Sequence, residues 1–312
     1  MRTTTTLESV INSVHEQSAN HYDNIVPIRD IRFESLVRMN IAGQSFGVLR
    51  SAQRLLANRL RVPFSYLNRC PAELQSENLN YWIEQEARNR QALFCRFAGN
   101  DLRAVFTERY TAIDHMEVLT KMLEYGFDPA CEIQLSLDAE MMVLKVPEYE
   151  RTFRLFEKDK IVPGISIANS EIGILALSIE AFYYRLICAN GMIAKTAVDA
   201  RYKHISRKAM DEFPMILEGV VSQSRHGQDR FMISTQTPVD NPMSSIETFA
   251  KQFQLSQEET EIVRQAYYLE QGGTMFHVIN AFTRAAQEPN LSAAEAYKLE
   301  RTGGHILGLI KH

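Results

Sequence analysis

The chain has few cysteines and no long apolar run. Its four cysteines lack C-x-x-C spacing, which argues against a zinc ribbon and suits buried thiols in a reducing compartment. None of the eight histidines is followed by another at three or four positions, so the spacing typical of metal sites is missing. No stretch reaches the roughly 18 consecutive apolar residues of a membrane span. We therefore expect no metal, no membrane segment and a cytoplasmic location.

Catalytic and nucleotide-binding motifs are also missing. The sequence contains neither a G-x-S-x-G nucleophile elbow nor a Walker A or G-x-G-x-x-G loop, the patterns that mark activated serines and bound phosphates. We expect no cofactor, and no catalytic residue can be assigned from a motif. The 312 residues are 45% apolar and 23% charged, which is typical of a globular protein with one large or two ordinary domains.

Alternating apolar and polar residues predict an antiparallel sheet of about five strands. Residues 91–97 and 102–107 flank a Gly99-Asn100 turn and read as one hairpin. Residues 133–141 form the longest alternation and predict a strand with one buried and one wet face. Residues 161–169 and 174–188 are separated by an Asn-Ser-Glu-Ile-Gly break and predict a second hairpin.

Segments with helical periodicity lie before, between and after these strands. Residues 48–60 predict a helix that ends before Pro63, and Asp114 is a candidate N-cap for a helix over 114–125. Residues 196–223 also have a helical pattern, interrupted at Pro214, and 228–236 read as a loop or short strand. Beyond the linker at 237–242, capping boxes begin at three serines, which are Ser244, Ser256 and Ser292.

The predicted fold is therefore α+β, an antiparallel sheet flanked by helices and followed by a helical subdomain. We expect residues 1–44 to be an N-terminal extension, 45–240 an α+β core domain and 241–312 a helical subdomain. No β-α-β alternation occurs, which argues against a doubly wound parallel sheet.

Charge is unevenly distributed along the chain. The net charge is −4, yet five arginines and no acid lie between Arg50 and Arg69. Five more arginines lie from Arg88 to Arg109 against two acids, and residues 201–208 carry four cations without an acid. Residues 244–270 are acidic. Separated charge of this kind allows one face to attract phosphate while the molecule as a whole stays mildly negative.

Aromatic residues lie among these cations, a combination that suits unpaired nucleic acid. Arginine and lysine contact phosphates, and aromatic rings stack on bases. The competing interpretation is that the tyrosines pack the sheet and the arginines pair with carboxylates. The candidate nucleic-acid-binding residues are Arg50, Arg54, Arg61, Arg103, Arg109, Tyr110, Arg185, Arg201, Tyr202, Lys203, Arg207 and Lys208.

Two other function classes stay open. The acidic helical subdomain and the negative net charge favour a protein-interaction module that regulates or inhibits a partner protein. Polar residues near strand ends favour a hydrolase or nuclease, with a polar site built from Asn169, Glu171, Arg185 and Asn190. Against it, asparagine at such positions commonly serves the turn itself.

Several short segments together resemble one family. They include VPFSYLNRCP at 62–71, DLRAVFTERYTAID at 101–114, PGISIANSEIG at 163–173, YRLICANGMI at 184–193 and LERTGGHIL at 299–307. With others in the same order, they make the chain similar, over about 45–307, to the phage/plasmid-like family that carries domain of unknown function 932.

The resemblance implies a setting and assigns no reaction. It places the protein in the DNA metabolism or host conflict of phages, plasmids and other mobile elements. The leading hypothesis is a non-enzymatic nucleic-acid-binding protein, for single strands in particular, acting in replication or recombination. A homo-oligomer fits the analogy in role with phage single-strand annealing proteins.

Overall fold

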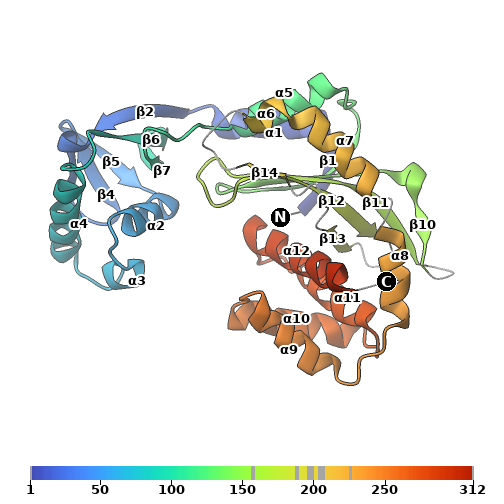
Figure 1. The fold of residues 1–312 in the computed structure, drawn as a ribbon. Helices are drawn as coiled ribbons and strands as arrows, with labels where there is room; N and C mark the ends of the chain where they lie inside the picture. The colour runs from blue at the N-terminus through green and yellow to red at the C-terminus, as the bar shows by residue number, and fades with distance from the viewer. Residues whose placement is uncertain are drawn as a thin grey trace.

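The computed structural model describes residues 2–155, 159–186, 190–194, 200–202, 208–224 and 227–310. Their fold is α+β, as the sequence predicts, with a helical C-terminal region (Figure 1). The strands of this described part form two sheets rather than the single expected sheet of about five strands. We call the larger one sheet A and the smaller one sheet B.

Sheet A is antiparallel throughout. Its order is β1 (Arg2–Thr6), β8 (Glu132–Leu137), β9 (Met142–Pro147), β11 (Lys160–Asn169), β12 (Leu177–Arg185) and β13 (Asn190–Ala194). In addition β10 (Phe153–Arg154) pairs with β11, and β14 (Ala200–Tyr202) pairs with β12. The hairpin predicted from 161–169 and 174–188 is confirmed, with Ile167 opposite Ile179.

The long alternation at 133–141 is not one strand throughout, because β8 ends at Leu137 and residues 138–141 form a turn before β9. The side chain of Asp138 accepts hydrogen bonds from the backbone N–H groups of Glu140 and Met141 at 2.8 and 3.0 Å, which closes a turn between β8 and β9. An aspartate that bonds its own backbone in this way is a common turn former. The pattern could not show the break, because the alternation continues through the turn.

Both faces of sheet A are buried, so the expected wet face is wrong. On one face the isoleucines and leucines share a core with α1 (Leu7–Ser18), α5 (His115–Tyr125) and α7 (Phe213–Ser224). On the other face lies α12 (Ala293–Leu309), as Figure 1 shows. Polar residues such as Lys145, Ser166 and Glu180 alternate with the apolar ones and are buried beneath this helix.

Sheet B has its own core. Its order is β2 (His21–Pro27), β6 (Ala92–Ala98), β7 (Asp101–Phe106), β5 (Gln44–Val48), β4 (Arg38–Ile41) and β3 (Ile31–Phe33). The predicted hairpin of β6 and β7 is confirmed. The helices α2 (Arg50–Arg59), α3 (Phe64–Leu67) and α4 (Ala72–Glu86) belong to this part, and Leu56 and Ile83 join Phe97 in its core. We call residues 21–106 the sheet-B lobe and the rest the sheet-A lobe.

Residues 1–44, expected to be an extension, supply strands to both sheets. Strand β1 pairs with β8 in sheet A, and β2 pairs with β6 in sheet B. The chain thus begins in sheet A, builds sheet B and returns to sheet A. These strands are short or polar, and a strand that pairs mainly through its backbone has no strong side-chain pattern.

The C-terminal helices are α8 (Gly227–Gln236), α9 (Pro242–Gln252), α10 (Gln257–Leu269), α11 (Met275–Ala285) and α12. The capping boxes at Ser256 and Ser292 are confirmed. The one at Ser244 is wrong, because Asn241 caps α9 by accepting from the Ser244 N–H. Helices α11 and α12 pack closely at Gly303, where an added Cβ would lie 2.5 Å from the Thr283 Cγ2 atom.

Two further elements differ from expectation. The described part of 196–223 contains strand β14, then α6 (Lys208–Asp211) and α7, rather than a helical segment interrupted at Pro214, which lies in the first turn of α7. Residues 228–236 belong to helix α8, not to a loop or strand. Among the helices that the structure describes, none is long and apolar enough to cross a bilayer.

Candidate functional site

Helix α2 and the turn after it present the first three predicted arginines to solvent. Ala52 and Leu56 face the sheet-B core, while Arg50 and Arg54 lie one turn apart and are exposed. The Arg54 guanidinium lies 5.8 Å from the centre of the Phe64 ring on α3. Arg61 follows the helix and is also exposed. Its φ of 56° turns the chain toward α3.

These arginines belong to a larger basic surface. No Asp or Glu occurs between Glu34 and Glu73. Arg69 is exposed there too, and its Nε donates to the Ser65 carbonyl at 3.2 Å. Tyr66 is 39% exposed. We define the α2–α3 surface as Arg50, Arg54, Arg61, Tyr66 and Arg69. Within the described ranges, none of its four arginines forms an ion pair with a carboxylate.

Arg103 does not lie on any surface. Its side chain is 7% exposed and donates from Nη2 to the Glu171 Oε2 at 2.6 Å. Its Nη1 contacts the Nδ1 atom of His21. The predicted phosphate contact is therefore a buried ion pair between β7 of sheet B and Glu171, two residues after the end of β11 of sheet A. The competing interpretation, pairing with a carboxylate, holds at this position.

Arg96 strengthens the same connection between the sheets. It donates from Nε to Asp23 at 2.9 Å, from Nη1 to the Glu171 carbonyl at 2.9 Å, and from Nη2 to Asp114. Asp114 is the N-cap residue of α5, as predicted, but its side chain makes no cap hydrogen bond. We call the group of His21, Arg96, Arg103, Asp114, His115, Asn169 and Glu171 the junction cluster.

Glu171 is the centre of the junction cluster. Its Oε1 accepts from the backbone N–H of His115 at 2.8 Å, at the first turn of α5. Burial acts to raise the pKa of Glu171, but attraction to His115, this amide bond and the Arg103 guanidinium outweigh burial and lower the pKa to about 2. Glu171 is thus an ionised, buried carboxylate that holds the Arg103 guanidinium and the N-terminus of α5.

Asn169 determines which ring nitrogen of His115 carries the proton. The Asn169 Nδ2 donates to the Ile113 carbonyl at 2.9 Å and lies 3.0 Å from the Nδ1 of His115. Since the amide nitrogen has only donors, the His115 Nδ1 accepts and its proton lies on Nε2. Burial lowers the pKa of His115 to about 4. Two of the predicted polar residues, Asn169 and Glu171, therefore meet at one place.

These pKa values predict an acid-sensitive fold. The pKa of His115 is lowered from 6.5 to about 4, so its contribution to stability is present above pH 6.5 and is lost as the pH falls to 4. The pKa of Glu171 is lowered from 4.5 to about 2, so its contribution is lost between those values. Urea midpoints measured at successive pH values should fall below pH 6.5, and His115→Gln should flatten the upper step. An unchanged upper step in that variant would contradict the assignment.

Arg185 lies far from this cluster. It donates to Asp159 at 2.7–2.9 Å and to Glu270 at 2.9 Å, with Phe276 4.9 Å from its guanidinium. Arg185 pairs with Ile161 across the sheet, eight residues before Asn169, which is about 26 Å at about 3.3 Å per residue. Asn190 pairs with Arg185 along the backbone. The four residues of the predicted polar site therefore form two separate groups.

The remaining candidate residues also lie in different places. Tyr110 stacks on Phe106 with 3.7 Å between ring centres, so its ring is packed internally. Arg109 is exposed. Arg201 and Tyr202 belong to β14 and Lys208 begins α6, but their side chains lie outside the described part. Lys203 and Arg207 fall wholly outside the described residues.

A small cavity adjoins the junction cluster. It has a volume of about 290 Å³ and is lined by Ser18, His21, Tyr22, Asp23, Arg96, Asp114, Met116 and Glu171. The Arg96 nitrogens that face it already donate to Asp23, Asp114 and Glu171. The cavity therefore offers no free guanidinium to a phosphate. No group of three metal-ligating side chains occurs in the part of the chain that the structure describes.

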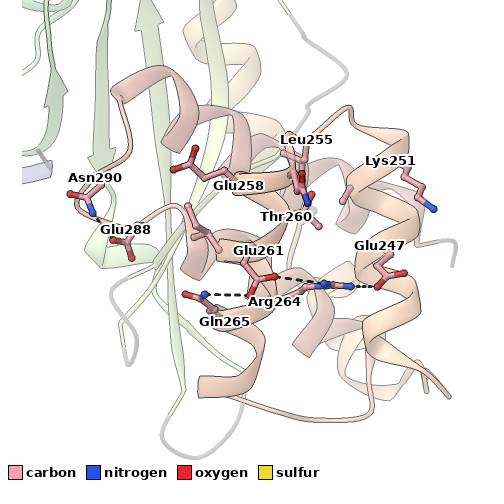
Figure 2. Close-up of a pocket in the computed structure, with 13 residues that line it drawn as sticks. Glu247, Lys251, Leu255, Glu258, Thr260, Glu261, Arg264, Gln265, Glu288 and Asn290 are labelled. Carbon is pink, nitrogen blue, oxygen red and sulfur yellow. Dashed lines mark hydrogen bonds and ion pairs between the residues drawn. The ribbon is translucent and has the colours of Figure 1, made fainter.

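A larger groove lies between α9 and α10, with a volume of about 880 Å³ (Figure 2). Ala250, Leu255 and Ile262 give it apolar walls. Its charged lining consists of Glu247, Lys251, Glu258, Glu261, Arg264 and Glu288. We call it the α9–α10 groove. Sequence reasoning identified the acidic segment but not the groove, which exists only once the helices pack.

Comparison with family models gave one match. The model described as a domain of unknown function, DUF932, matches residues 103–302. This span contains sheet A apart from β1, and the C-terminal helices nearly to their end. Most of the sheet-B lobe, including the α2–α3 surface, precedes it. Searches of curated proteins and of solved structures gave no match.

Proposed function

The chain belongs to the DUF932 family, a domain of unknown function, and we propose that this protein binds nucleic acid through its α2–α3 surface. The observation that supports the proposal is the set of exposed arginines there, Arg50, Arg54, Arg61 and Arg69, in a segment without acids. The proposal keeps Arg50, Arg54 and Arg61 from the sequence prediction and adds Arg69, which is exposed on the same surface. It leaves out Arg103, Arg185 and Tyr110, which are occupied inside the protein.

The chemistry of the surface suits a phosphate backbone. A guanidinium presents a planar fork of N–H donors to phosphate oxygens and keeps its charge at any physiological pH. Tyr66 supplies an exposed ring on which an unpaired base can stack. No motif on α2 or α3 reads base edges, so we propose binding with little sequence preference and a preference for single strands. The setting we propose is the replication or recombination of a phage or plasmid in a bacterial cytoplasm.

Salt dependence is the direct test. Contact between four arginines and a single strand should give a slope of log affinity against log salt of about −3, so affinity should fall about 50-fold from about 50 to about 200 mM salt. Fluorescence anisotropy with a labelled oligothymidine measures this slope. An affinity that does not change with salt, or no binding, would overturn the proposal.

A double variant locates the binding surface. Arg50→Ala/Arg54→Ala should weaken binding at low salt and reduce the slope by about 1.4, since each lost phosphate contact removes about 0.7. The matched control is Arg29→Ala on the same lobe, because Arg29 is exposed and lies 3.7 Å from the carboxylate of Asp30. If the control and the double variant weaken binding equally, the α2–α3 surface is not the binding site.

A further inference from the structure

The charge of the side chains that line the α9–α10 groove suits a cationic occupant. Four glutamates and two cations line it. Arg264 is neutralised by Glu247 and by Glu261, which lies 3.6 Å from its Nη1 (Figure 2). Within the described residues, Glu258 has no cation partner, and the Glu288 carboxylate accepts only from the Asn290 amide at 3.4 Å. The groove therefore has negative charge to spare around apolar walls.

The same chain carries a surface with the complementary properties. The α2–α3 surface has four exposed arginines without carboxylate partners in the described ranges. It also exposes apolar area, since Leu49 and Tyr66 are each 39% exposed. Burial of apolar area gives affinity, and opposite charges around it give orientation and speed of association. We propose that the α9–α10 groove of one copy of this protein receives the α2–α3 surface of a second copy.

The positions of the two surfaces determine the kind of assembly. The α2–α3 surface belongs to the sheet-B lobe, and the groove belongs to the C-terminal helices, well apart in Figure 1. The junction cluster ties the lobes together with buried ion pairs. Each contact joins two different surfaces, so every bound pair keeps one free groove and one free basic surface. Such head-to-tail contacts build rings or open chains.

Self-association and nucleic-acid binding then compete for the same arginines. This part of the inference rests on the proposed function, because both occupants use Arg50 and Arg54. Phosphates would displace the glutamate-lined groove from the arginines. Added oligonucleotide should therefore shift the protein toward smaller species, each with its α2–α3 surface occupied by the strand. The groove of a protein bound in this way stays free.

Two charge-reversal variants test the contact. In the surface variant, Arg50→Glu/Arg54→Glu, the groove is intact. In the groove variant, Glu258→Lys/Glu288→Lys, the α2–α3 surface is intact. Light scattering after gel filtration at about 0.1 M salt should show wild-type protein as species larger than a monomer, with masses that fall at about 1 M salt as screening increases. Each variant alone should be monomeric, with association weakened at least about tenfold.

Mixing the two variants gives the decisive result. The mixture contains one intact groove and one intact basic surface, and its two reversed surfaces are again opposite in charge, so it should regain the association that neither variant shows alone. Glu108→Lys/Glu150→Lys, which reverses two exposed charges elsewhere, should associate like wild type. Circular dichroism verifies that each variant is folded. Wild-type protein that stays monomeric, or variants that associate as wild type does, would overturn the proposal.

Nucleic-acid binding separates this proposal from the proposed function. The groove variant should bind oligothymidine at least as tightly as wild type, because its arginines remain and its competitor is gone. If it does so while wild-type protein is monomeric, the self-association proposal fails and the proposed function stands. Binding of an arginine-rich peptide to the groove of a monomeric wild-type protein would also overturn it, in favour of another protein partner.

Discussion

Glu171→Ala should lower the free energy of unfolding by about 3–5 kcal/mol, the usual cost of removing one partner of a buried ion pair. The substitution leaves the Arg103 guanidinium, whose side chain is 7% exposed, without its carboxylate. It also leaves the His115 N–H at the first turn of α5 without its acceptor. Urea unfolding followed by circular dichroism at neutral pH measures the loss.

The controls for Glu171 separate charge from shape. Glu108→Ala removes an exposed carboxylate two residues past β7 and should change stability by less than about 0.5 kcal/mol. Glu171→Gln keeps an acceptor for the His115 N–H and should lose less than the alanine variant. If Glu171→Ala unfolds at the wild-type urea concentration, the junction cluster does not hold the two sheets together.

Glu300→Ala should have an effect of similar size on the other side of sheet A. Lys145 on β9 is 2% exposed and lies 2.5 Å from the carboxylate of Glu300 on α12, which is 1% exposed. Removing the carboxylate leaves a buried ammonium over the Phe182 ring, 5.3 Å from its centre. We expect a loss of about 3–5 kcal/mol in the free energy of unfolding, measured by urea denaturation.

The double variant Lys145→Met/Glu300→Leu should behave differently. Well-packed apolar residues commonly replace a buried ion pair without loss, or with a gain of about 1–4 kcal/mol. We therefore expect the double variant to be at least as stable as wild type. A double variant as unstable as Glu300→Ala would show that the polar layer beneath α12 depends on this pair through its neighbours.

Much of the fold could be predicted from local patterns. The hairpins of β6 with β7 and of β11 with β12 follow from alternation and turn residues, and the capping boxes mark the starts of α10 and α12. Strands β1 to β5 could not be predicted. A strand such as Arg-Thr-Thr-Thr-Thr has no apolar alternation, and its partner β8 is distant in sequence.

The candidate site residues also differ in whether local sequence could identify them. Arg50 and Arg54 were identifiable because helical spacing and the absence of nearby acids are both local properties. Arg103 and Arg185 looked equivalent, but their partners Glu171 and Glu270 lie far along the chain. Only the packing of sheets and helices brings those carboxylates to the arginines. Local charge counts therefore identify Arg50 and Arg54 but miss partners that come from elsewhere in the chain. Even Arg59, in the same acid-free segment, pairs with Glu86 at 3.4 Å.

Strand β1 has a consequence for how the protein forms during synthesis. Arg2 pairs with Ser136, so strand β1 has no place in sheet A until β8 has emerged from the ribosome. At about 5–20 residues per second, that interval is on the order of ten seconds. Meanwhile sheet B, whose strands all lie between residues 21 and 106, is complete and can fold first. Strand β1 then has to close a long loop to join β8, which costs entropy, so sheet A gains this edge strand late.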